Sequence, residues 1–197
     1  QSVISQKACS MATIEKQAGR IEAARLRQEE FERSLTRFEK RLGYTFGNRR
    51  LLEQALTHPS FNTGPVLASA NNRRLEAEGD RLLAAKVDHV MRSVFAMKSE
   101  ESHLLLKGFL NSNVYLSAVG MSLGLDDCVR LFGHHARAGS LETQVRITAN
   151  AVEALIAAVE HDGTSTATEE LLSRHILPVS LPKSLASKIH RILVAKD

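Results

Sequence analysis

Two pairs of polar side chains stand at helical spacing and are of the types that bind metal ions. Glu76 and Asp80 are four residues apart, and Asn150 and Glu153 are three apart, so each pair would lie on one face of a helix. Oxygens of carboxylates and amides are the ligands that hard cations such as Mg²⁺ prefer. The four residues are therefore candidate metal ligands, although spacing alone does not bring the two pairs around one point.

The segment around the first pair resembles a known catalytic motif. Residues 72–80 read Asn-Arg-Arg-Leu-Glu-Ala-Glu-Gly-Asp and resemble the signature of the ribonuclease III family, whose usual form is Asn-Glu-Arg-Leu-Glu-Phe-Leu-Gly-Asp. The resemblance implies that Glu76 and Asp80 stand where the family holds Mg²⁺ for cleavage of double-stranded RNA. It also implies that Asn150 and Glu153 face them from a second helix.

The resemblance extends over three segments of the chain. Residues 42–61 are similar to the opening segment of the family, residues 104–116 to its middle helix, and residues 147–163 to its closing catalytic helix. Their order and spacing agree over about 120 residues, which makes the match more specific than a single motif would be. The resemblance therefore implies an all-α, ribonuclease III-type helical domain.

Two parts are predicted: a basic helical N-terminal extension over residues 1–41 and a ribonuclease III-like domain over residues 42–197. Residues 11–41 lack Pro, and four apolar side chains in this segment and directly after it share one helical face, namely Phe31, Leu35, Phe38 and Leu42. Only 34 residues follow Gly163, too few for the double-stranded-RNA-binding module of bacterial members. We expect no such module in this chain.

The other helices are predicted from stretches bounded by Gly, Pro and capping residues. Gly43 is expected to end the first helix, and Asn48 to cap the second. The predicted helical ranges are 48–57, 72–97, 99–118 as one or two helices, 142–161, 167–177 and 183–195. No stretch alternates convincingly as a strand, so periodicity also favours an all-α class.

Two of the five acidic positions in the family pattern are changed. Arg73 replaces a Glu and Asn150 replaces an Asp, so the formal charge over positions 73, 76, 80, 150 and 153 is −2 instead of −5. At ~4 Å and an effective dielectric of ~20, each unit charge is worth roughly 4 kcal/mol to a neighbouring ion before desolvation. We therefore expect vestigial catalytic positions, no bound metal and no cofactor, with Mg²⁺ needed only if the domain is active.

The positions after Glu76 also depart from the pattern. Ala77 replaces a Phe that helps two nuclease domains of the family dimerise, and it offers little apolar area for that contact. Glu78 places a charge where a Leu usually packs. We expect that the standard homodimer is lost and that a different partner surface is used.

Composition is that of a soluble globular protein, with 43% hydrophobic and 24% charged residues. No apolar run approaches the ~18–20 residues that span a bilayer, so no membrane contact is expected. Cys9 and Cys128 form no CxxC pair, which favours reduced thiols. The net charge of +4 lies mostly in residues 1–41, where nine Lys and Arg face six acids.

The basic residues of the extension and of the following helix are candidates for RNA contact. They are Arg20, Arg25, Arg27, Arg33, Arg37, Lys40, Arg41, Arg49 and Arg50. Each is also compatible with a solvated surface cation, and the extension as a whole with a charged helix packed by one stripe. The sequence leaves these two interpretations open.

The favoured hypothesis is a non-catalytic component of a large ribonucleoprotein. Ribonuclease III-like domains without activity occur in the large subunit of the mitochondrial ribosome and in RNA-editing complexes, and the resemblance favours the ribosome. The expected partners are structured RNA, in particular ribosomal RNA, and neighbouring proteins that could include another ribonuclease III-like domain.

The alternatives are a subunit of a mitochondrial RNA-editing or RNA-processing complex, an active Mg²⁺-dependent endoribonuclease, and a protein scaffold without RNA contact. The first residue is Gln, which is compatible with removal of a targeting peptide or with a missing start. On this basis we expect a location in the mitochondrial matrix.

Overall fold

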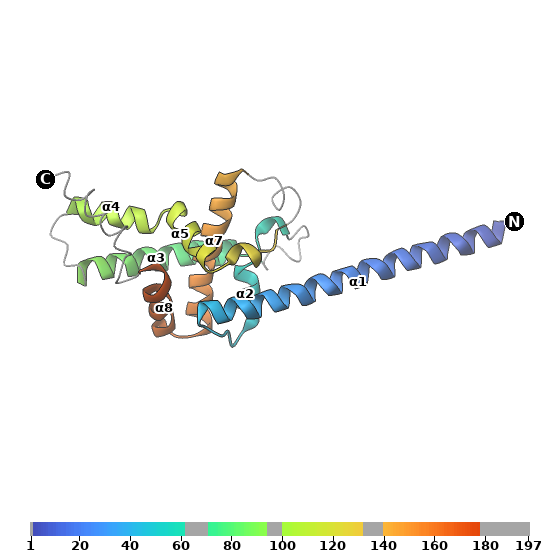
Figure 1. The fold of residues 1–197 in the computed structure, drawn as a ribbon, viewed down its shortest axis with the longest axis horizontal. Helices are drawn as coiled ribbons and strands as arrows, with labels where there is room; N and C mark the ends of the chain where they lie inside the picture. Colours follow the sequence, from blue (N-terminus) through green and yellow to red (C-terminus); the bar gives the residue numbers. More distant parts are fainter. Residues whose placement is uncertain (1, 62–70, 94–99, 132–139, 178–197) are drawn as a thin grey trace. The chain divides into compact units, whose positions relative to one another are not determined.

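The computed structural model describes residues 2–61, 71–93, 100–131 and 140–177, which are mostly helical (Figure 1). The elements are α1 (Ser2–Leu42), α2 (Arg49–Ala55), η1 (Pro59–Phe61), α3 (Arg73–Ser93), α4 (Glu100–Leu110), α5 (Asn113–Ser122), η3 (Leu125–Asp127), α7 (Leu141–Asp162), α8 (Ser165–Leu171) and η4 (Leu172–Ile176). The described residues contain no strand, and a single β-bridge joins Thr57 to Arg130. The predicted all-α class is confirmed.

Helix boundaries follow the predicted signals, except at the start of α1. α1 ends before Gly43, which has a φ of 72°, and the Asn48 side chain caps α2 by accepting from Arg50 N. α1 begins at Ser2 rather than at residue 11. The range 99–118, predicted as one or two helices, forms two, because Ser112 Oγ accepts from Tyr115 N and starts a new helix, α5. The predicted helix 183–195 lies outside the described residues.

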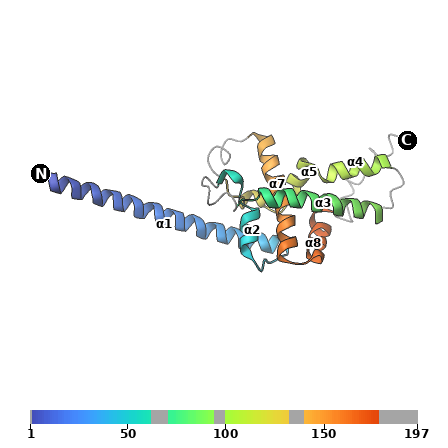
Figure 2. The same ribbon diagram turned by 180° about the vertical axis from the view of Figure 1, so that it is seen from behind.

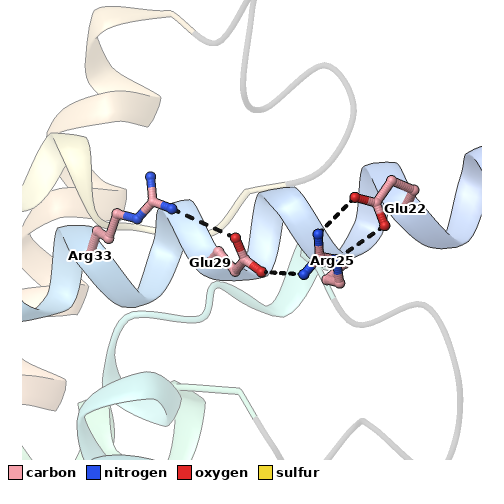
Figure 3. A network of polar contacts seen from close by, with 4 residues as sticks. All are labelled: Glu22, Arg25, Glu29 and Arg33. Carbon is pink, nitrogen blue, oxygen red and sulfur yellow. Dashed lines mark hydrogen bonds and ion pairs between the residues drawn. The ribbon is translucent and has the colours of Figure 1, made fainter.

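The chain divides into two compact units, Gln1–Arg37 and Phe38–Asp197. The first unit is the N-terminal part of α1. A ladder of ion pairs at i, i+3 and i, i+4 spacing runs along it, joining Glu22, Arg25, Glu29 and Arg33 (Figure 3). Exposed pairs of this kind each stabilise a helix by about 0.3–0.5 kcal/mol, so the ladder supports helical structure in a segment with few apolar side chains.

The core of the second unit is built around α7. All residues from Ile147 to Val159 are buried except Asn150, which is half-buried. A helix that is apolar on all sides requires cover on all sides, and α3 and α5 pack most extensively on it, followed by α2 and α8. Figures 1 and 2 show, from opposite sides, α7 crossing α3. No described helix is long and apolar enough to cross a membrane.

Two glycines allow the close approach of helices on α7. A Cβ placed on Gly79 of α3 would lie 1.8 Å from the backbone oxygen of Glu153. A Cβ placed on Gly120 of α5 would lie 2.6 Å from Cγ2 of Thr148. The backbones of α3 and α7 are therefore in direct contact at Gly79, and this contact fixes where the two helices cross.

The C-terminal end of α7 is held by a carboxylate that accepts three hydrogen bonds. Asp162 Oδ1 accepts from Asn48 N at 2.6 Å, and Oδ2 accepts from Gly47 N at 2.9 Å and from Tyr44 Oη at 3.0 Å. Burial acts to raise the pKa of Asp162, but these three donors together lower it below its ordinary value. The segment before α2 is thereby tied to the end of the central helix.

Candidate functional site

The candidate site lies where α3 crosses α7. Gly79 touches the backbone of Glu153, so the side chains one turn earlier on each helix, Glu76 and Asn150, come face to face. Asn150 donates a side-chain hydrogen bond to the carboxylate of Glu76. Asp80 and Glu76 both act electrostatically on Glu153. The structure thus brings together all four residues that the sequence singles out.

The four side chains differ in their exposure to solvent. Glu153 is 8% exposed, whereas Glu76 and Asn150 are half-buried and Asp80 is exposed. Burial raises the pKa of Glu153 to about 7, and the nearby carboxylates of Asp80 and Glu76 add to the shift. Three carboxylates that lie close together in a partly buried site repel one another, and a bound cation would reduce this repulsion.

Two arginines act electrostatically on Glu76. Burial raises the pKa of Glu76, while Arg73, the Asn150 amide and Arg146 each act to lower it. Arg73 lies one turn before Glu76 on α3, and Arg146 one turn before Asn150 on α7. The family pattern does not draw attention to Arg146; its position four residues before Asn150 is the signal that could have found it.

The residues fit a divalent metal site only in part. Three acidic ligands remain, but Asn150 supplies no charge, and it bonds to Glu76, a carboxylate that a metal would need. Within the described ranges, no three His, Cys, Asp or Glu side chains are already arranged to hold a metal ion. With Arg73 and Arg146 also acting on Glu76, the arrangement does not fit the family's Mg²⁺ site.

The two substituted positions next to Glu76 have different environments. Ala77 is exposed and presents only a methyl group to solvent. Glu78 is half-buried, and its Oε1 lies 2.9 Å from Nε2 of His161 near the end of α7. Glu78 therefore joins α3 to α7 within the domain.

The predicted RNA-contact residues fall into two groups. Four of them have intramolecular partners. Arg25 and Arg33 belong to the ion-pair ladder of Figure 3, Arg41 donates to Gly124 O at 3.2 Å, and Arg49 pairs with Glu39 at 2.8 Å. The other five are exposed and, within the described part of the chain, have no ion-pair partner: Arg20, Arg27, Arg37, Lys40 and Arg50.

Comparison with known proteins agrees with this geometry. The profile of the family described as Ribonuclease-III-like matches residues 48–180. Ribonuclease 3 of Legionella pneumophila (strain Lens) is 32% identical over 139 residues, which are 71% of this chain and 59% of that protein. Ribonuclease 3 of Pseudomonas aeruginosa (strain LESB58) is 30% identical over 170 residues, which are 83% of this chain and 71% of that protein.

A solved structure shows the same fold. The nuclease domain of ribonuclease III from Campylobacter jejuni superimposes with a TM-score of 0.62 at 26% identity, covering 74% of this chain and 97% of that domain. The residues that the family profile matches, 48–180, include α3 and α7, which carry the candidate site.

Proposed function

Because the chain belongs to the ribonuclease III family, we propose that it is an RNA-binding member that holds structured RNA without cutting it. In this proposal the nuclease fold serves as a binding module within a ribonucleoprotein. The assembly we favour is the large subunit of the mitochondrial ribosome, which places the protein in the mitochondrial matrix with ribosomal RNA and neighbouring proteins as partners.

The observation that carries the proposal is the environment of Glu76. Its carboxylate accepts a hydrogen bond from Asn150 and lies within the electrostatic reach of Arg73 and Arg146. Burial and the nearby Asp80 raise the pKa of Glu76 on balance, and the amide and the two guanidinium groups offset only part of this effect, but they already supply some of the positive potential that a metal ion would supply. Because Asn150 is uncharged and Arg73 and Arg146 add positive charge near Glu76, we expect the site to bind Mg²⁺ too weakly for metal-assisted hydrolysis.

A second candidate function is Mg²⁺-dependent cleavage of double-stranded RNA. It is supported by the grouping of Glu76, Asp80 and Glu153 and by the relatives named Ribonuclease 3. The names of the relatives favour cleavage, while the substitutions at 73 and 150 favour its loss. The chain spans 59% of the length of the Legionella protein, so the activity of that whole protein enters here as a proposal.

Restoring the site distinguishes the two candidates. The full chain, the double variant Arg73→Glu/Asn150→Asp and the control Arg74→Glu/Asn150→Asp are incubated with a labelled RNA duplex and Mg²⁺. Arg74 is exposed beside Arg73 and is not among the groups that act on Glu76. The control therefore carries the same change in charge at a residue that does not influence the candidate site. We expect cleavage to be strongest in the Arg73→Glu variant and absent in the parent.

The opposite result is equally clear. Cleavage by the unmodified chain that disappears in Glu153→Gln would establish the endoribonuclease. The choice of assembly is tested separately, by asking whether the native protein co-sediments with the mitochondrial large ribosomal subunit or with an RNA-processing or editing complex. Co-purification with proteins alone, insensitive to ribonuclease treatment, would instead identify a protein scaffold.

A further inference from the structure

A heptad pattern runs along α1. Seven residues follow one another at alternating spacings of three and four, and we call this row the seam: Ile21, Ala24, Gln28, Phe31, Leu35, Phe38 and Leu42. All of them except Gln28 are apolar. Residues with this spacing lie along one line of a helix, and they are the residues by which two helices pack side by side in a coiled coil.

The seam changes from buried to exposed along the helix. Its last three members are no more than 1% exposed, and Phe31 is half-buried. Towards the N-terminus, Ala24 is exposed and Ile21 is 65% exposed. The first part of the seam is therefore an apolar row that nothing in the described part of the chain covers.

The ion-pair ladder of α1 leaves this row open. Its acids, Glu22 and Glu29, occupy heptad positions that point away from a partner helix. Figure 3 shows the two acids bonded to Arg25 and Arg33 along the helix. The ladder therefore stabilises α1 without covering the seam.

Basic side chains flank the exposed part of the seam. In a coiled coil, the positions directly beside the apolar row carry the charges that select the partner. Here these positions hold Arg20, Arg25 and Arg27, all of which are exposed, and they hold no acid before Glu32. Arg25 already pairs with acids of the ladder, whereas Arg20 and Arg27 have no ion-pair partner among the described residues.

A second copy of this chain fits these flanks poorly. In a parallel pair of α1 helices, Arg20 of one copy would face Arg25 of the other. In an antiparallel pair, the edge with Arg20 and Arg27 would face the same edge of the second copy. Like charges placed opposite each other disfavour association, whereas Glu or Asp at the flanking positions of a different helix would pair with the arginines.

We propose that the exposed part of the seam, from Ile21 to Phe31, is a docking surface for a helix of another protein that is apolar at its own heptad positions and acidic beside them. Such a helix covers the apolar row and pairs with the flanking arginines at the same time. An RNA backbone would satisfy the arginines but would leave Ile21 exposed to solvent. The inference goes beyond the proposed function, because it concerns a protein partner and residues outside the candidate site.

The test uses two synthetic helical peptides of about four heptads with Ile and Leu at the apolar positions. One carries Glu at every flanking position and the other carries Lys. Binding of each peptide to the full chain is measured by fluorescence anisotropy in the absence of RNA. We expect the Glu peptide to bind and the Lys peptide to bind at least about tenfold more weakly. The double variant Arg20→Glu/Arg27→Glu should reverse this preference.

Ile21→Ser tests the seam itself, and Leu26→Ser is its matched control. Leu26 is 53% exposed on the same helix but lies off the seam. Both changes remove an exposed aliphatic side chain at a similar cost in helix propensity. Ile21→Ser should weaken binding of the Glu peptide by about tenfold or more, and Leu26→Ser by less than about twofold. Circular dichroism checks that both variants keep the helix content of the parent.

Four results would overturn the inference. The first is that the Glu peptide does not bind the parent chain or binds no better than the Lys peptide, a comparison that requires no variant to fold. The second is an equal effect of Ile21→Ser and Leu26→Ser. The third is a dimer of the parent in sedimentation equilibrium that Ile21→Ser dissociates, which would identify a second copy as the occupant. The fourth is binding of an RNA duplex that is lost in Arg20→Glu/Arg27→Glu while the Glu peptide does not bind, which would identify RNA.

Discussion

Replacing Gly79 by Ala is expected to destabilise the domain more than any other single methyl addition to its helices. The new Cβ would lie 1.8 Å from the backbone oxygen of Glu153 and 2.5 Å from its carbonyl carbon. Ordinary contact begins near 3.4 Å, so α3 would have to move from α7 by more than 1 Å. Backbone cannot rotate away as a side chain can, so the whole interface must open.

The size of the effect follows from what that interface buries. Leu75, Leu83 and Val87 of α3 are fully buried, and overpacking of a core costs about 1–3 kcal/mol or more. We expect a loss of about 3 kcal/mol in the free energy of unfolding, after the roughly 1 kcal/mol that Ala gains over Gly in a helix. For a chain of this size that corresponds to a melting temperature lower by roughly 6–12 °C.

Gly108 provides the matched control for this measurement. It lies in α4, and a Cβ placed there meets no atom within 4 Å. Gly108→Ala should therefore stabilise the protein by about 0.5–1 kcal/mol through helix propensity alone. Both variants are compared with the parent by urea unfolding followed by circular dichroism. If Gly79→Ala unfolded within 1 kcal/mol of the parent, the direct backbone contact between α3 and α7 would be refuted.

Three further outcomes are expected from the same unfolding assay. Arg49→Ala should lower the free energy of unfolding by about 3 kcal/mol, because it leaves the carboxylate of Glu39, only 6% exposed, without its cation. The control Arg50→Ala, at an exposed position, should change the free energy of unfolding by less than about 0.5 kcal/mol. Equal effects of the two variants would contradict the structural role of the Arg49–Glu39 ion pair. Because the pKa of Asp162 is lower in the folded state, its contribution is present above its unfolded pKa and is lost as pH falls through the folded one. The Asp162→Asn variant should therefore lose stability at neutral pH and show a weaker decline in acid than the parent; an unchanged acid limb would be inconsistent with the three hydrogen bonds. Gly120→Ala should cost about 1–2 kcal/mol, less than Gly79→Ala, because its new methyl meets side-chain methyl groups that can shift.

Much of the helical layout is predictable because its signals are local. A Pro-free run with an apolar stripe predicts α1, and the structure buries Leu35, Phe38 and Leu42 on that stripe. Gly43 and Asn48 mark a helix end and a helix start through their own backbone and side-chain preferences. The acidic positions of the candidate site are likewise evident from spacing within each helix and from the family pattern.

Only the tertiary structure decides which helices meet, and at which residues. Three interactions join different segments of the chain: Asn150 with Glu76, Arg146 with Glu76, and Arg49 with Glu39. The number of residues between two such partners does not predict that their side chains are close in space. The sequence pattern treats Arg49 and Arg50 as equivalent surface cations, and the fold buries the partner of one of them.

The physical reason is that spacing along a helix fixes the face of a side chain, while the helix crossing fixes its neighbours. Here that crossing is set by the absence of a side chain at Gly79. The sequence by itself determined that this chain has a ribonuclease III-type set of helices with an altered acidic site. The packing of α3 on α7 decided that the altered site combines three acids, an amide and two guanidinium groups.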